Sequence, residues 1–400
     1  MYSLVLRNCM LQEIGRLVDI GISDGVISDI GTVDKEGSTS IDVEGRLVLM
    51  SFVIPHLHLC KVYTLDLVGS EAVALYRRGK MENSARAIEF ASRLKERYRE
   101  DWIYVNARRA LYECFSHGAT HVRAFADVDS RAGLEAVKAL LRLRDECADD
   151  VCLQVVAFPQ EGLIREPESQ ELLYRAIEMG CDVVGGIPWI EDTERDMRRH
   201  VQIVFDIAVS HGKDVSMLTD DAGDPTLRTT EMLCQETLKR GWMGRVSACH
   251  ARALALYSRR RLHTVVNILK KAGVSLVVSP HTGRVWAPVR DMLEGGVNVA
   301  LGQDDINDAY YPFGRGKMLE VAFLAAHLLD MMTPEDAELL IRMITENAAR
   351  SIGVEGHVLR VGSPANLVVL PCRTAFEAVW TQPEPLYIIK RGEVRPDMGE

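Results

Sequence analysis

The chain has 400 residues, of which 47% are hydrophobic and 26% charged, and its formal net charge is −10. This composition is ordinary for a folded soluble protein, and the length fits a barrel of about 250 residues with a smaller accessory unit. Long disordered tracts are therefore not expected. The acidic balance and the lack of a basic stripe with interleaved aromatic residues argue against nucleic acid as a partner.

The cysteine pattern and the hydropathy indicate the compartment. Nine cysteines are scattered without a C-x-x-C pair, as is typical of buried thiols in a reducing environment. The first residues show no basic segment followed by a long apolar run, and no stretch approaches 18 consecutive apolar residues. We expect a cytoplasmic protein without a membrane partner, which binds a small-molecule substrate and forms a symmetric homo-oligomer.

The two ends of the chain share a β pattern. Residues 1–50 alternate in short apolar pieces (SLVLRN, RLVDIGI, GVISDIG, RLVLM) broken by Gly and Asp, and this indicates a small antiparallel β unit. The same pattern resumes after residue 360 as NLVVL, LYIIKRG and EVRP. The sequence therefore predicts one small β-sandwich domain formed by residues 1–50 and 357–400.

Between these ends, apolar strand candidates alternate with amphipathic helix candidates, as in parallel α/β proteins. Eight strands are expected, at residues 51–55, 119–126, 151–158, 182–187, 214–218, 245–249, 274–279 and 297–302. Eight such units predict a (β/α)8 TIM-like barrel over residues 51–356. The long insertion at 61–118 contains a helix-like segment at 84–100, and we expect it to cover part of the barrel mouth as a lid.

Functional residues of such a barrel gather at the carboxyl ends of its strands. His56 and His58 directly follow the first strand, and alternate residues of an extended segment point the same way, so both imidazoles can reach one ion. Asp304 and Asp305 follow the last strand. Asp304 can bind a cation through one oxygen and accept a proton from water with the other, while Asp305 is predicted to contact substrate.

The other strand ends offer further candidates, each with a structural alternative. Gln160 could bind an amide-like ligand or only local backbone, and Asp221 could move protons or belong to an Asp-rich turn. His250 could be a core histidine, but its position favours a place beside the metal. Trp189 is predicted to contact substrate, as is His281, which we do not expect to ligate. The fourth strand supplies no lysine for a bridging carbamate, which favours a single divalent ion.

The segments PHLHL, VVAFPQEGL, DVVGGIPW, GRVSACHA and LGQDDINDAYYPFGRGKM resemble the cytosine deaminase branch of the amidohydrolase superfamily, to which N-isopropylammelide aminohydrolase belongs. The likeness spans nearly the whole chain. It implies that His56, His58 and Asp304 bind the metal, zinc or iron, and that His250 helps to hold the reactive water. It also implies that Gln160 contacts a substrate amide and that Asp221 stands where the deaminases carry a proton-shuttling glutamate.

The sequence departs from the family at Leu218, where the resemblance implies a metal-binding histidine at the end of the fifth strand. An aliphatic side chain cannot ligate an ion. His250 ligates instead, or water fills the gap, or the site is poor in metal and catalytically altered. Cys60 follows the histidine pair where cytosine deaminases tend to have an acidic residue. Its geometry permits a thiolate ligand, although a packing role is the more common one for such a cysteine.

Three hypotheses for the function follow. The first is a metal-dependent deaminase or aminohydrolase that acts on a cyclic nitrogen-rich molecule such as a pyrimidine, triazine or pterin. The second is a cyclic amide hydrolase, in which the same ion polarises a carbonyl and ring opening yields a carboxylate without ammonia. The third is a barrel that has lost catalysis and binds a small ligand, for which Leu218 is the main support.

Overall fold

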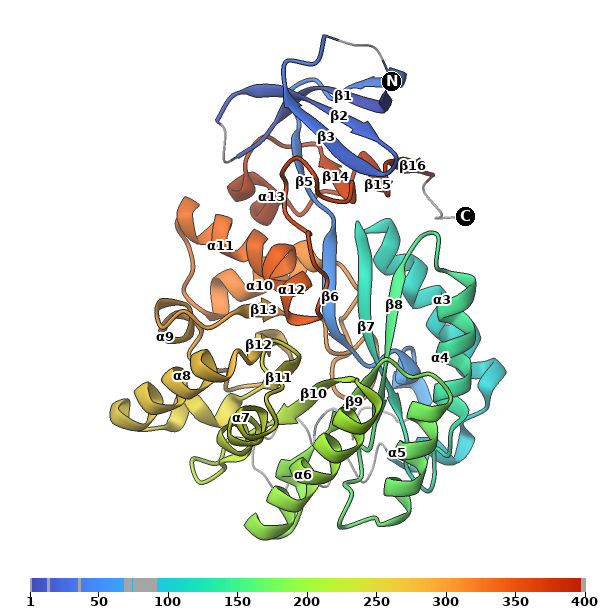
Figure 1. Ribbon diagram of the computed structural model, residues 1–400, viewed down its shortest axis with the longest axis vertical. Helices are drawn as coiled ribbons and strands as arrows, with labels where there is room; N and C mark the ends of the chain where they lie inside the picture. Colours follow the sequence, from blue (N-terminus) through green and yellow to red (C-terminus); the bar gives the residue numbers. More distant parts are fainter. Residues whose placement is uncertain (1, 13–14, 35–36, 68–73, 75–91, 397–400) are drawn as a thin grey trace.

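The computed structural model describes residues 2–12, 15–34, 37–67, 74 and 92–396, which form a β/α barrel and a separate terminal sheet (Figure 1). The barrel strands are hydrogen-bonded in chain order, and each neighbouring pair is parallel. They are β6 (Phe52–Leu57), β7 (Ala119–Asp127), β8 (Cys152–Phe158), β9 (Val183–Gly186), β10 (Asp214–Thr219), β11 (Val246–His250), β12 (Ser275–Val278) and β13 (Val299–Leu301). The predicted fold class and all eight predicted barrel strands are confirmed.

Helices cover the outside of the barrel (Figure 1). On α4, for example, Val137, Leu140 and Leu143 are buried and share one helix face. Among the described residues, no helix is both long and apolar enough to cross a lipid bilayer. The helices are α3 (Glu100–Ser116), α4 (Glu135–Glu146), α5 (Glu168–Glu178), α6 (Glu194–His211), α7 (Thr229–Arg240), α8 (Arg259–Ala272), α9 (Val289–Glu294), α10 (Met318–Leu328), α11 (Pro334–Ile344), α12 (Glu346–Ser351) and α13 (Ala375–Thr381), with 3-10 turns η1 (Leu59–Lys61), η2 (Arg93–Arg97), η3 (Pro188–Ile190), η4 (Arg252–Leu256) and η5 (Pro280–Thr282).

The terminal sheet joins both ends of the chain, as Figure 1 shows. Its apolar side chains, among them Leu6, Ile20, Val48 and Leu367, form one hydrophobic cluster. The expectation of a purely antiparallel unit is wrong, because β4 and β5 both pair in parallel with β1. The β4 strand pairs with residues 2–7 of β1, and β5 pairs with Met10 further along it. Both strands therefore run in the same direction as β1. The strands are β1 (Tyr2–Met10), β2 (Leu17–Ser23), β3 (Val26–Gly31), β4 (Gly37–Asp42), β5 (Leu47–Met50), β14 (Leu367–Leu370), β15 (Tyr387–Lys390) and β16 (Glu393–Arg395).

The insertion after β6 is described only in part. Residues 84–91 of the expected helix lie outside the described residues, so the lid stays a prediction. The expected helix is wrong at Arg93–Arg97, which form a 3-10 turn. There the ammonium of Lys95 lies 2.6 Å from Asp129 Oδ2 and 2.8 Å from Glu161 Oε1. These buried contacts tie the turn to the loops that follow β7 and β8.

A buried polar cluster lies where the terminal sheet meets the barrel. The His357 Nε2–H donates to the carbonyl oxygen of Ser51 at 2.8 Å, and the Lys390 ammonium donates to the carbonyl oxygen of Thr120 at 3.1 Å. The His121 ring packs on His357 with ring centroids 5.2 Å apart. Burial, with a smaller contribution from Lys390, lowers the pKa of His357 to about 4. The junction therefore holds His357 in its neutral form.

We expect acid to destabilise the protein partly through His357. Its pKa is about 4 in the folded protein against 6.5 for an unperturbed histidine, so the unfolded chain takes up the proton first as the pH falls. The stabilising effect is complete above pH 6.5 and is lost between pH 6.5 and 4, by about 3 kcal/mol. His357→Gln keeps an N–H donor without a titrating group. Its melting temperature should fall less steeply than that of the wild type over this pH range, and parallel curves would contradict the assignment.

Candidate metal centre

Asp304 is hydrogen-bonded through its backbone to His56, near the end of β6, and to His58, which directly follows β6. The Asp304 N–H donates to the carbonyl oxygen of His56 at 2.9 Å, and the His58 N–H donates to the carbonyl oxygen of Asp304 at 2.7 Å. A parallel bridge pairs Leu57 with Asp304. The contacts that close the barrel therefore also bring the first and last strand ends of the predicted site together.

Three imidazoles surround one oxygen of Asp304. The Oδ1 atom lies 3.0 Å from His56 Nε2, 3.8 Å from His58 Nε2 and 3.7 Å from His250 Nε2. All four side chains are buried. Potential ligand atoms of His56, His250 and Asp304 lie within 4.8 Å of one another, as do those of His58, Asp304 and Asp305. Imidazole nitrogens with a carboxylate oxygen are the donors that zinc and iron bind in proteins, so these residues could hold one divalent cation.

The electrostatics of this cluster also suit a cation. Burial alone would raise the pKa of Asp304, but the imidazoles of His250 and His56 outweigh it and hold that pKa well below its usual range. Burial lowers the pKa values of His58 and His250, which favours the neutral imidazoles that metals bind. At His56, burial is outweighed by the thiol of Cys249 and by Asp304, which raise its pKa to about 10. A cation would displace that proton.

The backbone is left-handed at the two strand ends that aim these side chains. His250 has a φ of 69°, Ala251 of 47° and Asp304 of 70°. Such conformations cost roughly 1–3 kcal/mol for residues other than glycine and persist where surrounding contacts fix them. The Ala251 N–H, for instance, donates to the carbonyl oxygen of Thr219 at 3.0 Å. His250 is thereby turned toward Asp304.

The cluster opens into a small cavity at the carboxyl ends of the strands. The predicted residues Gln160, Trp189, Asp221 and Asp305 all contribute to its lining. His281 does not: its Nε2 lies 3.0 Å from the carbonyl oxygen of Gln303, and its ring packs against Tyr311. The described residues that line the cavity are His58, Lys61, Gln160, Ile187, Trp189, Leu218, Asp221, His250, Asp304, Asp305 and Tyr310.

One side of the cavity carries polar groups that the sequence analysis did not identify. The ammonium of Lys61 donates to Gln160 Oε1 at 2.5 Å, and Gln160 Nε2 donates to the hydroxyl of Tyr310 at 3.2 Å. Lys61 also lies 3.6 Å from Asp127 Oδ1. Lys61 stands three residues after His58, and this nearness to the predicted metal ligands could have identified it as a site residue from the sequence. Tyr310 comes from the loop after β13, whose path the sequence does not show.

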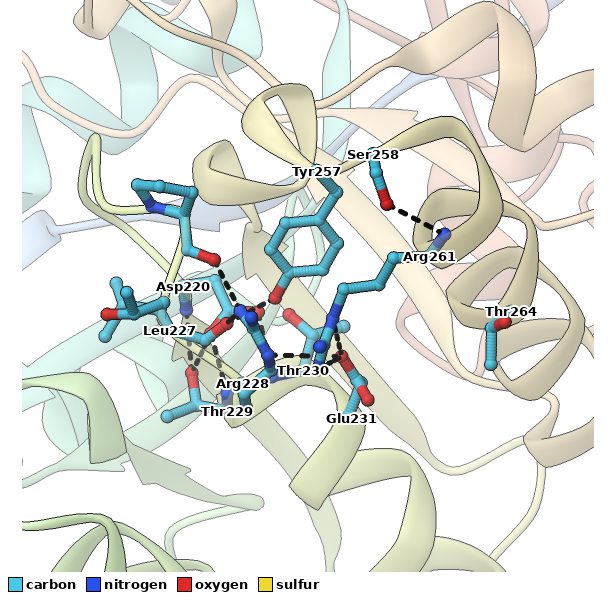
Figure 2. Close-up of polar contacts among 12 residues, drawn as sticks. Asp220, Leu227, Arg228, Thr229, Thr230, Glu231, Tyr257, Ser258, Arg261 and Thr264 are labelled. Atoms are coloured by element: carbon cyan, nitrogen blue, oxygen red, sulfur yellow. Dashed lines mark hydrogen bonds and ion pairs between the residues drawn. The ribbon is translucent and has the colours of Figure 1, made fainter.

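The loop after β10 is anchored at its base by Asp220. Its Oδ1 accepts the Thr229 N–H at 2.6 Å, and its Oδ2 accepts the Thr230 N–H at 3.2 Å, so the carboxylate caps the first turn of α7 (Figure 2). Figure 2 also shows the hydroxyl of Tyr257 donating to the carbonyl oxygen of Leu227 in the same loop. Asp220 therefore has a structural role. The residue after it, Asp221, faces the cavity.

That next residue, Asp221, forms a buried ion pair with Arg252, which the sequence analysis also missed. The Arg252 Nε–H donates to Asp221 Oδ1, and its Nη2 donates to Thr282 Oγ1 at 2.9 Å. A Cβ atom on Gly283 would lie 1.5 Å from Arg252 Nη1, so a larger residue there would displace the guanidinium. The Asp221 carboxylate is thus fixed at the edge of the cavity.

A buried carboxylate holds the loops of Gln160 and Trp189 in place. Glu191 accepts the backbone N–H groups of residues 163–165 at 2.7–3.1 Å and the His200 Nδ1–H at 2.7 Å. The Nε2 of His200 accepts the Ile187 N–H at 3.1 Å. One carboxylate and one imidazole therefore fix both loops on the β8–β9 side of the cavity.

We expect Glu191→Gln to destabilise the protein by about 2–3 kcal/mol, because the new amide leaves buried N–H groups without an acceptor. The free energy of unfolding from urea titration measures the effect. Glu194→Gln is the matched control, since Glu194 pairs with Arg198 on the exposed surface and such pairs contribute less than about 1 kcal/mol. Equal free energies of unfolding for the two variants would show that the buried network does not stabilise the fold.

Leu218 and Cys60, for which the sequence left alternatives open, are both buried. Leu218 lines the cavity and is 5% exposed. Cys60 belongs to neither group of potential ligands among the described residues. The hydroxyl of Tyr98 donates to its sulfur at 4.0 Å, and burial raises its pKa to about 12. Cys60 is therefore held as a thiol, which does not favour the thiolate ligand.

A β/α barrel with histidines and an aspartate gathered at its strand ends is an arrangement that many barrel hydrolases use to bind a catalytic metal. The chain belongs to the amidohydrolase family, whose model matches residues 39–395. The protein is 30% identical over 395 residues to the N-isopropylammelide isopropyl amidohydrolase of Pseudomonas sp. (strain ADP), with 98% of this chain and 97% of that protein covered.

Two further relatives act on other rings. The pterin deaminase of Rhizobium rhizogenes is 24% identical over 399 residues, which cover 94% of this chain and 87% of that protein. The crystal structure of 5-methylcytosine deaminase from Klebsiella pneumoniae, liganded with 5-fluorocytosine, superimposes with a TM-score of 0.90 and 30% identity. The alignment covers 98% of this chain and 97% of that one. These likenesses support the class of hydrolases that act on cyclic nitrogen compounds.

Proposed function

We propose that the protein is a metal-dependent deaminase or aminohydrolase that acts on a cyclic nitrogen-rich small molecule such as a pyrimidine, triazine or pterin. The observation that carries the proposal is the approach of three imidazole Nε2 atoms to within 3.8 Å of Asp304 Oδ1 beside a cavity. The rings named in the three relatives support the substrate class.

In this proposal His56, His58 and Asp304 hold one zinc or iron ion, and His250 completes the ligand set because Leu218 cannot ligate. When bound, the ion supplies Lewis-acid chemistry that makes water a nucleophile near neutral pH. The donor set fits such an ion, since one oxygen of Asp304 lies within 3.8 Å of an Nε2 atom from each of the three histidines.

The remaining residues bind the ring and move protons. Gln160 and Lys61 present an amide and an ammonium to its polar edge. The second oxygen of Asp304 accepts a proton from the attacking water, and Asp221 delivers a proton to the leaving nitrogen. Asp305 and Trp189 complete the contacts with the ring. His281 acts from behind the cavity lining, through the loop that carries Gln303.

The direct test is release of ammonia or amine from a panel of aminated pyrimidines, triazines and pterins, with protein reconstituted separately with zinc, iron or manganese. We expect turnover of at least one ring in one metal form. No turnover of any ring in any metal form would overturn the proposal. Mass spectrometry of the products also distinguishes deamination from cyclic amide hydrolysis, which would open a ring without releasing ammonia.

Leu218 favours a second candidate, a barrel that binds a small ligand without catalysis, because it removes a ligand that the family resemblance implies. Elemental analysis of the purified protein distinguishes the two. A stoichiometric transition metal supports the enzyme, whereas a metal-free protein that still binds one of these rings supports the binding protein.

A further inference from the structure

Lys61 fixes the orientation of the Gln160 amide. An ammonium group has only donors, so the amide oxygen, and not the amide nitrogen, must face Lys61 Nζ at 2.5 Å. The amide nitrogen then donates one hydrogen to the hydroxyl of Tyr310 at 3.2 Å and keeps the other. A ring N–H aimed at the amide oxygen would share that oxygen with an ammonium and face its positive charge. The Lys61–Gln160 pair therefore favours hydrogen-bond acceptors on a ligand.

The ammonium of Lys61 has donors to spare. It carries three hydrogens, and within the described part of the chain its one hydrogen bond goes to Gln160. Asp127 Oδ1 lies 3.6 Å from Lys61 Nζ, beyond hydrogen-bond distance, and has no partner of its own among the described residues. Lys61 is only 5% exposed, and buried charged groups are nearly always hydrogen-bonded. Because Lys61 lines the cavity, an acceptor atom of a ligand can take these donors.

The positive charge of Lys61 is balanced only in part. Among the described residues, Asp127 is the one carboxylate that pairs with it, and the other oxygen of Asp127 lies 3.5 Å from Lys95 Nζ. Burial alone would lower the pKa of Lys61, but Asp127 outweighs burial and raises that pKa, so the ammonium stays charged. The titratable groups within electrostatic range of Lys61 include His58, Cys60, Lys95, Asp127, Asp305 and Asp308.

Trp189 adds another donor to the same cavity. Its indole Nε1–H is buried and has no hydrogen-bond partner among the described residues, and an indole nitrogen cannot accept. The lining also includes Asp221 and Asp305, whose carboxylates can accept the amino hydrogens of a ring. The cavity therefore suits a ring that has acceptors on one edge and N–H groups elsewhere.

We propose that the cavity selects oxo-rings whose edge toward Lys61 and Gln160 carries acceptors alone, and that it binds acidic rings of this kind as their anions. The inference narrows the substrate class of the proposed function and rests on it only in placing a ring in this cavity. An oxo group beside a ring nitrogen without hydrogen forms such an edge. Loss of an acidic ring N–H proton turns a donor into an acceptor and supplies the charge that Lys61 attracts. Lys61 is then a specificity residue.

The test uses uracil, 5-fluorouracil and 6-azauracil, whose ring N–H becomes more acidic in that order. None of them carries an amino group to lose, so calorimetry measures binding to zinc-loaded protein without turnover. We expect the affinity to rise about ten-fold per pH unit up to each ligand's own pKa and then to level, because the anion is the form that binds. The pH midpoint should therefore shift along the series. One midpoint shared by all three ligands, or no rise with pH, would overturn the inference.

One variant, its control and removal of the metal locate the charge that binds the anion. Lys61→Gln should weaken the binding of the 6-azauracil anion at least about ten-fold. Lys317→Gln is the matched control, since Lys317 is also buried but pairs with Glu384 and is absent from the described lining. Metal-free wild type should keep the shift of the midpoints. An anion preference that is unchanged in Lys61→Gln, or lost with the metal, would place the anion on the metal and overturn the inference.

Failure of the proposed function gives a different result. If no ring is turned over in any metal form, the enzyme proposal fails, while the three midpoints still test the recognition of anions. If aminated rings are turned over but the midpoints coincide, the recognition of anions fails and the enzyme proposal stands.

Discussion

Asp304→Asn is expected to lower kcat/KM by at least about 10³-fold on whichever ring the protein hydrolyses best. The substitution removes the charge that three imidazoles surround at 3.0–3.8 Å and the oxygen that accepts a proton in the proposed reaction. Asparagine tolerates the left-handed backbone at this position, where φ is 70°. The backbone bonds to His56 and His58 do not involve the side chain, so we expect the fold to persist.

Asp330→Asn is the matched control for this variant. Asp330 also has a left-handed backbone, with a φ of 54°, and it lies on the surface after α10. We expect its kcat/KM and its metal content by elemental analysis to equal those of the wild type. If the Asp304→Asn protein is folded, loaded with metal and fully active, Asp304 is neither a required metal ligand nor the proton acceptor.

Leu218→His is expected to raise the affinity for zinc at least about 10²-fold, which corresponds to about 2.7 kcal/mol. Leu218 lines the cavity and pairs in register with Cys249, next to His250. An imidazole here would add a nitrogen ligand to those of His56, His58 and His250. Competition with a chromophoric chelator at fixed pH measures the dissociation constant without any need for turnover.

Leu218→Gln is the control for polarity alone, since its amide is a poor zinc ligand of similar size. We expect it to bind zinc no more tightly than the wild type. If Leu218→His and Leu218→Gln have the same dissociation constant as the wild type, the end of β10 does not face the ion. The metal centre would then need a different geometry from the one proposed.

Local patterns in the sequence were sufficient for the architecture and for part of the site. Apolar strand candidates that alternate with amphipathic helices predicted eight barrel strands, because burial against helices on the outside demands that pattern. The same reading failed where tertiary contacts decide the local conformation. Arg93–Arg97 adopt a 3-10 turn with Lys95 held by buried carboxylates, and the β4 and β5 strands run parallel to β1.

By itself the sequence determined which residues stand at strand ends: His56 and His58 two apart on an extended segment, and Asp304 after the last strand. Only the tertiary structure decided which of those ends meet, because closure of the barrel joins residues 248 positions apart. It alone revealed the Lys61–Gln160–Tyr310 contacts and the Asp221–Arg252 pair. Such contacts depend on loop paths, which no local periodicity encodes.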